Sequence, residues 1–385
     1  MQFKTRLNFL FEKKRIEYLL QKNSKKKRAC GIDGVYPSGL RSFWKEHGED
    51  IKKLILDGKY VPLPAEKVMI PKPGSNKKRE LKLYCVPDRM IMHGLYKLIV
   101  KYFDKVFSDS SFGFRPGRGC YQALNHAIEL MNEGYYYAIS IDLESFFDMV
   151  NHEILSKILV KHIKDKRIID LIMTYMKTKV VYKNHVFRNY IGVPQGSALS
   201  PLLANIYLNE FDQRMDLLGY RFARYADDIV LFARNEQEKE KVYSEAENFL
   251  LRKLKLKINQ EKTVIEKGRL LYLGYEIKKC ESGIYQFYVG EKKTEKMYEK
   301  MKVHLQKNLS DEEWIWRLGA FNRGWLNYYK YTDCDSTGEI AARADKIERG
   351  CIKKRGLSTK SKGYVSMSEW WNMLVCQRNP EVEYE

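Results

Sequence analysis

Two acidic sites in the middle third of the chain have the chemistry to hold metal ions. Asp142 ends the apolar run AISIDL, and Asp227 and Asp228 lie at the tip of RYADDIVLF. A carboxylate flanked by Ile and Val at a strand end is costly unless a cation or a donor compensates it. If the two strands are neighbours, three carboxylates meet, and hard divalent cations such as magnesium relieve their repulsion. Two such ions can activate an attacking hydroxyl and stabilise a leaving pyrophosphate.

The alternative is that these aspartates are ordinary turn residues or surface partners. For an isolated Asp-Asp pair in a hairpin, that alternative is the better one. The motifs around the pair must therefore decide between the two interpretations.

The elements that position these residues follow from periodicity and turn residues. We expect a helix over 8–23 and two strands, 67–72 and 79–84, joined by a loop. Asp88 is a predicted N-cap for the helix that follows. The middle third alternates, with strands expected at 135–143 and, with a tight reversal at the acidic pair, at 221–234. The remaining expected elements are helices 152–163, 166–177 and 237–253, a helix opening at Ser200-Pro201, a hairpin over 180–193, and strands 270–277 and 283–289.

The last hundred residues change character and are expected to be helical. Ser310-Asp-Glu-Glu313 forms a capping-box pattern before an apolar series. We therefore predict two domains, residues 1–288 and 289–385.

Composition narrows the class of protein. The 69 Lys and Arg exceed the 49 Asp and Glu by 20, and residues 1–110 alone hold 25 basic and 12 acidic side chains. This surplus favours a polyanionic partner, although a merely solvated surface is the alternative. The hydrophobic content of 44% excludes a disordered chain. A mean hydropathy of −0.51 and the lack of a long apolar run argue against a membrane protein. Seven cysteines without a C-x-x-C pair argue against zinc and fit a reducing cytoplasm.

The motifs together resemble those of reverse transcriptases. YADD (225–228) resembles the YxDD box, and DLESFF (142–147) resembles the first catalytic aspartate motif. The blocks GIDGV (31–35), IPKPG (70–74) with KKR (77–79), FGFRPGR (112–118), GVPQGS (192–197), SPLLAN (200–205), LKIN (256–259) with Lys262-Thr263, and LYLG (271–274) follow in family order. FNRGWLNYY (321–329) resembles the maturase, or thumb, segment of group II intron proteins. The resemblance implies an α+β right-hand polymerase with fingers, an antiparallel palm sheet and a helical thumb.

The resemblance also implies roles for residues around the acidic cluster. Asp142 and Asp227 would ligate two magnesium ions, with manganese as a possible substitute, and Asp228 and the Leu143 carbonyl would support them. Phe147, five residues after Asp142, matches the steric gate that excludes a 2′-hydroxyl and selects deoxynucleotides.

Further roles fall on residues that would meet the nucleotide and the nucleic acid. Lys72 and Arg79 are the expected triphosphate ligands, with Lys77 and Lys78 as alternatives. Gln195 and Gly196 would lie against the nascent base pair, and Lys262 would donate a proton to the leaving pyrophosphate. Arg115, Arg118 and Arg323 are candidates for nucleic-acid contacts, although Arg115 and Arg118 could instead hold a structural turn. Ser197, Ser200 and Asn205 fit either contacts with the template or the nucleotide, or helix caps.

The expected activity is RNA-directed DNA synthesis from dNTPs, with an RNA template and a DNA or RNA primer. Two alternatives stay open: an RNA-binding splicing cofactor, and a domesticated reverse transcriptase that acts with a noncoding RNA in antiphage defence. No Cys/His cluster follows the thumb segment, so we expect no C-terminal endonuclease. We expect a cytoplasmic protein with no membrane partner. The sequence leaves the oligomeric state open.

Overall fold

The computed structural model describes residues 6–25, 29–71, 78–183, 185–305, 308–332, 334–359 and 363–378. The chain forms two compact units. The first comprises Met1–Ala123, Ile139–Leu231 and Gln237–Val264, and the second comprises Leu124–Ala138, Phe232–Glu236 and Ile265–Glu385. These units do not coincide with the division at residue 288, which stays a prediction for the functional domains.

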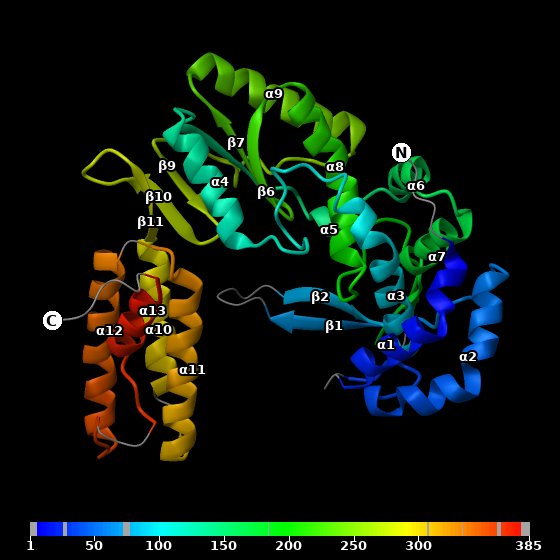
Figure 1. The fold of residues 1–385 in the computed structure, drawn as a ribbon, viewed down its shortest axis with the longest axis horizontal. Coiled ribbons are helices and arrows are strands. Elements are labelled where there is room, and N and C mark those ends of the chain that lie inside the picture. Colours follow the sequence, from blue (N-terminus) through cyan, green and yellow to red (C-terminus); the bar gives the residue numbers. More distant parts are fainter. Residues whose placement is uncertain are drawn as a thin grey trace. The chain divides into compact units, whose positions relative to one another are not determined.

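A four-stranded sheet in the first unit carries the basic hairpin. β1 (Ala65–Pro71) lies beside β2 (Lys78–Leu83) in Figure 1. The two strands pair antiparallel, with Ile70 opposite Arg79. β4 (Val180–Tyr182) runs parallel to β1, and β5 (His185–Phe187) forms the other edge, so the order is β2-β1-β4-β5. The predicted pairing of the two strands of the basic hairpin is therefore confirmed, whereas the hairpin predicted over 180–193 extends only to Phe187.

The helices of the N-terminal region pack on one another, and two details differ from expectation. The segment predicted as one helix is a short 3-10 helix, η1 (Leu7–Phe11), followed by α1 (Lys13–Ser24), because Glu12 between them has an extended backbone, with φ −58° and ψ 134°. α3 (Val86–Phe103) begins before Asp88, with Cys85 as its N-cap. Asp88 is instead buried and accepts hydrogen bonds from the Tyr60 and Tyr175 hydroxyls, at 2.6 and 3.0 Å, so its predicted capping role is wrong. The other elements of this region are η2 (Pro37–Gly39) and α2 (Leu40–Leu56).

The acidic residues lie on a second four-stranded sheet. Its order is β6-β7-β3-β8, formed by Arg221–Tyr225, Asp228–Ala233, Tyr137–Ile141 and Val264–Lys267. The predicted tight reversal is confirmed, because only two residues separate β6 from β7. α8 (Ser200–Leu217) packs against β6 and contributes a mostly buried face to the core. The other helices here are α4 (Cys120–Asn132), α5 (Phe146–Met149), α6 (His152–His162), α7 (Lys166–Met176) and α9 (Glu236–Lys253).

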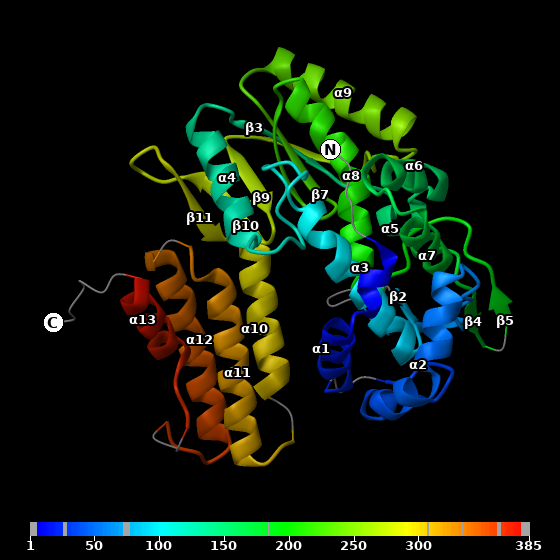
Figure 2. The same ribbon diagram turned by 45° about the vertical axis from the view of Figure 1, so that its right-hand side comes forward.

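The second unit combines a small antiparallel sheet with helices. β9 (Arg269–Tyr272), β10 (Tyr275–Lys279) and β11 (Tyr285–Val289) lie in the order β11-β10-β9. The strand predicted over 270–277 is therefore two strands, because Leu273 and Gly274 both adopt positive φ, +48° and +82°. α10 (Glu291–Leu305), α11 (Asp311–Tyr329) and α12 (Cys334–Lys354) run alongside one another in both views, with α13 (Met367–Arg378) against α11 and α12 (Figures 1 and 2).

The predicted cap of α11 is confirmed, since the Ser310 hydroxyl accepts the Glu313 N–H. Buried residues such as Trp314, Leu318 and Trp371 form the core of these helices. Among the described helices, none combines the length and the apolar character that crossing a bilayer requires.

Candidate active site

The three aspartates lie at the ends of neighbouring strands in the first unit. Asp142 directly follows β3, Asp227 lies in the two-residue turn after β6, and Asp228 opens β7, which neighbours β3. Leu143 forms an isolated antiparallel bridge with Ile258. The Asp142 carbonyl accepts the Asn259 N–H at 2.8 Å, so the predicted LKIN motif fixes the backbone of the first aspartate.

Electrostatics show that the three carboxylates act on one another. Burial raises the pKa of Asp228 to about 6, and the charges of Asp227 and Asp142 contribute to this rise. Burial also raises the pKa of Asp227, as does the charge of Asp142, whereas Arg79 and Arg224 oppose the rise. Ionisation of Asp227 and Asp228 beside Asp142 is therefore unfavourable without a compensating cation.

Lys262 already supplies one positive charge to the cluster. Its ammonium donates to Asp142 Oδ2 at 3.1 Å, and 62% of its side chain is exposed. A cation that approaches Asp142 would compete with an exposed and weakly held ammonium.

The donor set fits a hard divalent cation in its chemistry. It offers oxygen atoms only, and the repulsion among the carboxylates falls when a cation binds. Within the described residues, no three His, Cys, Asp or Glu side chains are already arranged as a metal site. The fit therefore rests on the kind of donors and on their charge.

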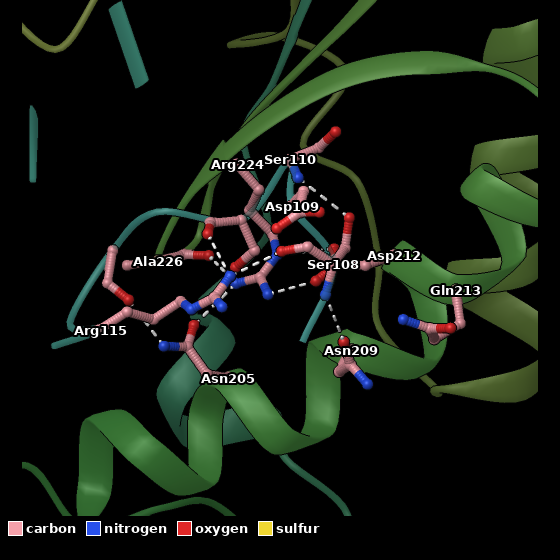
Figure 3. Close-up of polar contacts among 12 residues, drawn as sticks. Ser108, Asp109, Ser110, Arg115, Asn205, Asn209, Asp212, Gln213, Arg224 and Ala226 are labelled. Atoms are coloured by element: carbon pink, nitrogen blue, oxygen red, sulfur yellow. Dashed lines mark hydrogen bonds and ion pairs between the residues drawn. The ribbon is translucent and has the colours of Figure 1, made fainter. Parts of the chain in front are cut away.

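The turn that carries Asp227 has an unfavourable backbone conformation. Ala226 has φ +59°, which costs a residue with a β-carbon about 1–2 kcal/mol. Its carbonyl accepts a hydrogen bond from Arg224 at 2.9 Å. Gly113 packs against its backbone N so closely that a β-carbon there would overlap it. Figure 3 shows Arg224, Asn205 and Ala226 in one group of polar contacts.

Sequence reasoning assigned no role to Arg224. The available signal was an arginine within an apolar strand, two residues before the acidic turn, together with Asp212 on an otherwise buried helix face. Both side chains are fully buried in the structure and form an ion pair.

Phe147 is held by the loop of the GVPQGS motif. The Phe147 carbonyl accepts the Val193 N–H at 2.6 Å, and the Val150 carbonyl accepts the Gly192 N–H at 2.8 Å. The buried His152 ring bonds through Nε2 to the Gly192 carbonyl at 2.8 Å. The half-buried Phe147 ring therefore has a fixed backbone, as a steric gate would require.

Gln195 and Gly196 lie against the basic hairpin. The Gln195 carbonyl accepts the Lys82 N–H at 2.8 Å. Gly196 has φ +124°, and a β-carbon there would lie 2.6 Å from the Lys82 carbonyl oxygen. The close backbone approach predicted for Gly196 is thus made to β2. Lys82, which sequence reasoning also missed, donates to Asn189 Oδ1 at 3.2 Å, and burial lowers its pKa.

Of the predicted triphosphate ligands, the structure describes Arg79 and Lys78. Arg79 is exposed on β2, and its charge acts on Asp227. Lys78 is exposed at the start of the same strand. Lys72 and Lys77 lie outside the described residues.

Arg115 serves a structural turn rather than an exposed surface. Its side chain is 3% exposed and pairs with Asp104 at 2.8 Å. It also donates to the carbonyls of Ser108, Ser111 and Asp104, at 2.6, 2.7 and 2.8 Å. The structure thus contradicts the nucleic-acid contact expected for Arg115 and favours the alternative that the sequence left open.

The other polar candidates divide between internal and outward positions. Arg118 is partly exposed and pairs with Asp109. The Ser197 hydroxyl accepts the Ser200 N–H at 3.2 Å just before α8, whose N-cap residue is Leu199. Asn205 is buried and uses its amide inside the protein, so it is neither a cap nor a template contact.

Arg323 belongs to α11 in the second unit. Its guanidinium lies 4.9 Å from the centre of the Trp370 ring. Nearby on the same helix, the Tyr328 hydroxyl donates to the Leu273 carbonyl at 2.5 Å, and the Tyr329 hydroxyl donates to the Gly274 carbonyl at 3.3 Å. The maturase-like segment thus holds the turn between β9 and β10.

Comparison with known proteins agrees with this geometry. Residues 70–277 match the family model described as reverse transcriptase (RNA-dependent DNA polymerase). The chain is 29% identical over 295 residues to the protein YkfC of Escherichia coli (strain K12), an alignment that covers 66% of this chain and 77% of YkfC. It is 30% identical over 215 residues to the group II intron-encoded protein LtrA of Lactococcus lactis subsp. cremoris, which covers 56% of this chain and 36% of LtrA.

A third relative comes from yeast. The chain is 25% identical over 307 residues to the putative COX1/OXI3 intron 2 protein of Saccharomyces cerevisiae, covering 64% of this chain and 35% of that protein. The chain thus spans about a third of the length of LtrA and of this yeast protein.

Proposed function

The chain belongs to the reverse transcriptase (RNA-dependent DNA polymerase) family, and on that premise we propose that it synthesises DNA from dNTPs at the cluster of Asp142, Asp227 and Asp228. The observation that carries the proposal is the mutual effect of these carboxylates at the ends of neighbouring strands. Such a cluster suits phosphoryl transfer, which depends on positioning and on compensation of developing charge.

Reverse transcriptases generally use divalent metal ions. We infer that two magnesium ions, replaceable by manganese, would be held here by Asp142 and Asp227, with Asp228 and the Leu143 carbonyl in support. Bound there, they would supply the positive charge that favours the ionised primer hydroxyl and the leaving pyrophosphate.

The remaining roles belong to side chains around the cluster. Arg79 and Lys72 would bind the triphosphate. The charge of Arg79 already acts on Asp227, which supports this role for Arg79. Phe147 would exclude a 2′-hydroxyl, and Gln195 with Gly196 would border the nascent base pair. Lys262, already at Asp142, would donate a proton to the pyrophosphate. Arg118 and Arg323 remain our candidates for contacts with the nucleic-acid backbone.

RNA is the expected template partner, together with a DNA or RNA primer. The names of the relatives favour one second function, that of a splicing cofactor. LtrA is named as a group II intron-encoded protein, and a 25% identical relative from Arabidopsis thaliana is named nuclear intron maturase 2, mitochondrial. Both functions can reside in one chain, since splicing assistance needs RNA binding and not the acidic cluster.

Primer extension on an RNA template tests the proposal. The wild type should extend a primer with dNTPs and poorly with NTPs. Asp227→Asn should abolish extension while RNA binding stays nearly intact, because the carboxylate serves the reacting groups and not the template. Asp170→Asn, which changes an exposed aspartate on α7, is the matched control and should extend normally. Near-normal extension by Asp227→Asn would remove the cluster from catalysis.

A further inference from the structure

A buried arginine links helix α8 to the two-residue turn of Ala226 and Asp227, called the catalytic turn below. Arg224, on β6, is 0% exposed. Its Nε and Nη2 donate to the two carboxylate oxygens of Asp212 on α8, at 2.7 and 2.5 Å. Its Nη1 donates to Asn205 Oδ1 at 2.8 Å and to the Ala226 carbonyl at 2.9 Å (Figure 3). One planar group thus joins α8 to the residue before Asp227.

The segment containing Gly113 completes this arrangement on the other side of the turn. Asn205 Nδ2 donates to the Gly113 carbonyl at 2.7 Å. The Arg224 carbonyl accepts the Phe112 N–H at 2.8 Å, and Arg224 N–H donates to the Ser110 carbonyl at 2.8 Å. Ala226 therefore lies between the guanidinium and the Gly113 backbone.

We propose that Arg224 is a positioning residue for the polymerase reaction, which it serves by fixing the turn that presents Asp227. The inference rests on the proposed function of the acidic cluster. A positive-φ alanine persists only where its surroundings determine it. The guanidinium does this because its rigid fork binds Asp212 with two donors and still reaches the Ala226 carbonyl.

The energetics of the pair support a role beyond stability. Burying an arginine and an aspartate costs desolvation that their attraction only partly returns, so an apolar pair would serve stability equally well. Apolar side chains could not hold the Ala226 carbonyl. The pair of Arg224 and Asp212 therefore fixes the orientation of the Ala226 carbonyl, which an apolar pair could not do.

Asn205 and Asn209 offer a matched pair of variants. Both are buried amides on α8, four residues apart, and both bond to the segment between Val106 and Gly113. Asn209 accepts the Ser108 N–H at 3.2 Å and donates to the Val106 carbonyl at 3.3 Å, so it does not contact the turn. Asn205 bonds to both Arg224 and Gly113. Truncation of either removes two hydrogen bonds, but only Asn205→Ala removes a partner from the Arg224 guanidinium, which then keeps Asp212 and Ala226.

The experiment compares kcat, the KM for dNTP, the Kd for an RNA–DNA duplex and the melting temperature of the two variants. Asn205→Ala should lower kcat by about tenfold to a hundredfold, as a misplaced catalytic group does. The KM and Kd should stay near wild type, because no substrate contact is lost. Asn209→Ala should melt at a similarly lowered temperature with kcat close to wild type. Equal kcat values for the two variants would overturn the inference, as would a loss confined to KM.

Arg224→Lys gives an independent readout. It keeps a charge beside Asp212, whereas Arg224→Ala would leave a buried carboxylate unpaired and fail to fold. Lysine lacks the fork, so the folded Arg224→Lys variant should show the same kcat loss with unchanged KM. A fully active Arg224→Lys variant would contradict positioning by the guanidinium. An inactive wild type would instead reject the proposed function itself.

Discussion

A methyl group added at Gly113 tests whether the position of the catalytic turn sets the rate of polymerisation. An ideal β-carbon at this residue would lie 3.0 Å from the Tyr225 carbonyl carbon and still closer to Ala226 N, whereas ordinary contact begins at 3.4 Å. The neighbouring atoms are backbone, so they cannot rotate away. Gly113 has no positive φ, so alanine is compatible with its own backbone. The Gly113 segment and the turn must therefore separate by on the order of 1 Å, and a displacement of that size at a catalytic group can cost about a hundredfold in rate.

Single-turnover extension at saturating dNTP and template measures this loss directly. We expect Gly113→Ala to lower the rate by about a hundredfold and to destabilise the fold by about 1–3 kcal/mol, as overpacking does. Gly119→Ala is the control, because its nearest neighbour is the flexible end of Gln122 at 3.4 Å. A Gly113→Ala variant that melts earlier but extends as fast as Gly119→Ala would refute the coupling between turn position and rate.

Three further expectations test the gate, a buried glutamate and the basic N-terminal run. Phe147→Val should improve NTP use relative to dNTP use by about tenfold or more, measured as competing kcat/KM values; unchanged selectivity would remove Phe147 from the gate. Burial raises the pKa of Glu348 from 4.5 to about 7. The contribution of this carboxyl to the free energy of unfolding is therefore fully present below pH 4.5 and is lost as pH rises through 7. Glu348→Gln should therefore stabilise the protein at pH 8 by roughly 3 kcal/mol but hardly at pH 4, in melts where exposed Glu339→Gln shows no such difference. Replacing residues 25–28 by alanine should weaken RNA binding and flatten the log–log salt dependence by about 0.7 for each lost phosphate contact; an unaltered slope would exclude that run from the interface.

The sequence was sufficient for the features that local patterns encode. Short runs bounded by turn residues located β1, β2 and the β6–β7 reversal, and helical spacing located α6, α7 and α9. The order of the motifs indicated that Asp142 and Asp227 lie on neighbouring strands. The local sequence around each aspartate does not itself specify that the two strands pair. The motifs supplied that information because they belong to one family with one topology.

The features that local patterns do not encode were missed or misassigned. Arg115 and Arg118 stand three residues apart in one glycine-rich segment, yet one is enclosed by carbonyls and the other is partly exposed. Asp88 resembles an N-cap because the chain enters a helix there, but the hydroxyls of Tyr60 and Tyr175 draw it into the core. For Asp88 the deciding partners lie 28 and 87 residues away along the chain. For Arg115 they lie only 4 to 11 residues away, but on a folded loop whose conformation no local spacing reports.

Arg224 shows why the charges behind the site must be considered together with those inside it. Its positive charge opposes the rise in the pKa of Asp227, but Asp212 lies against the same guanidinium and makes the buried pair neutral overall. A neutral pair can hold the turn without neutralising the charges of Asp142, Asp227 and Asp228. Lys262 is exposed beside Asp142, so it can yield to an incoming cation. Arg224 therefore places Asp227, whereas the exposed Lys262 beside Asp142 leaves the cluster able to bind cations.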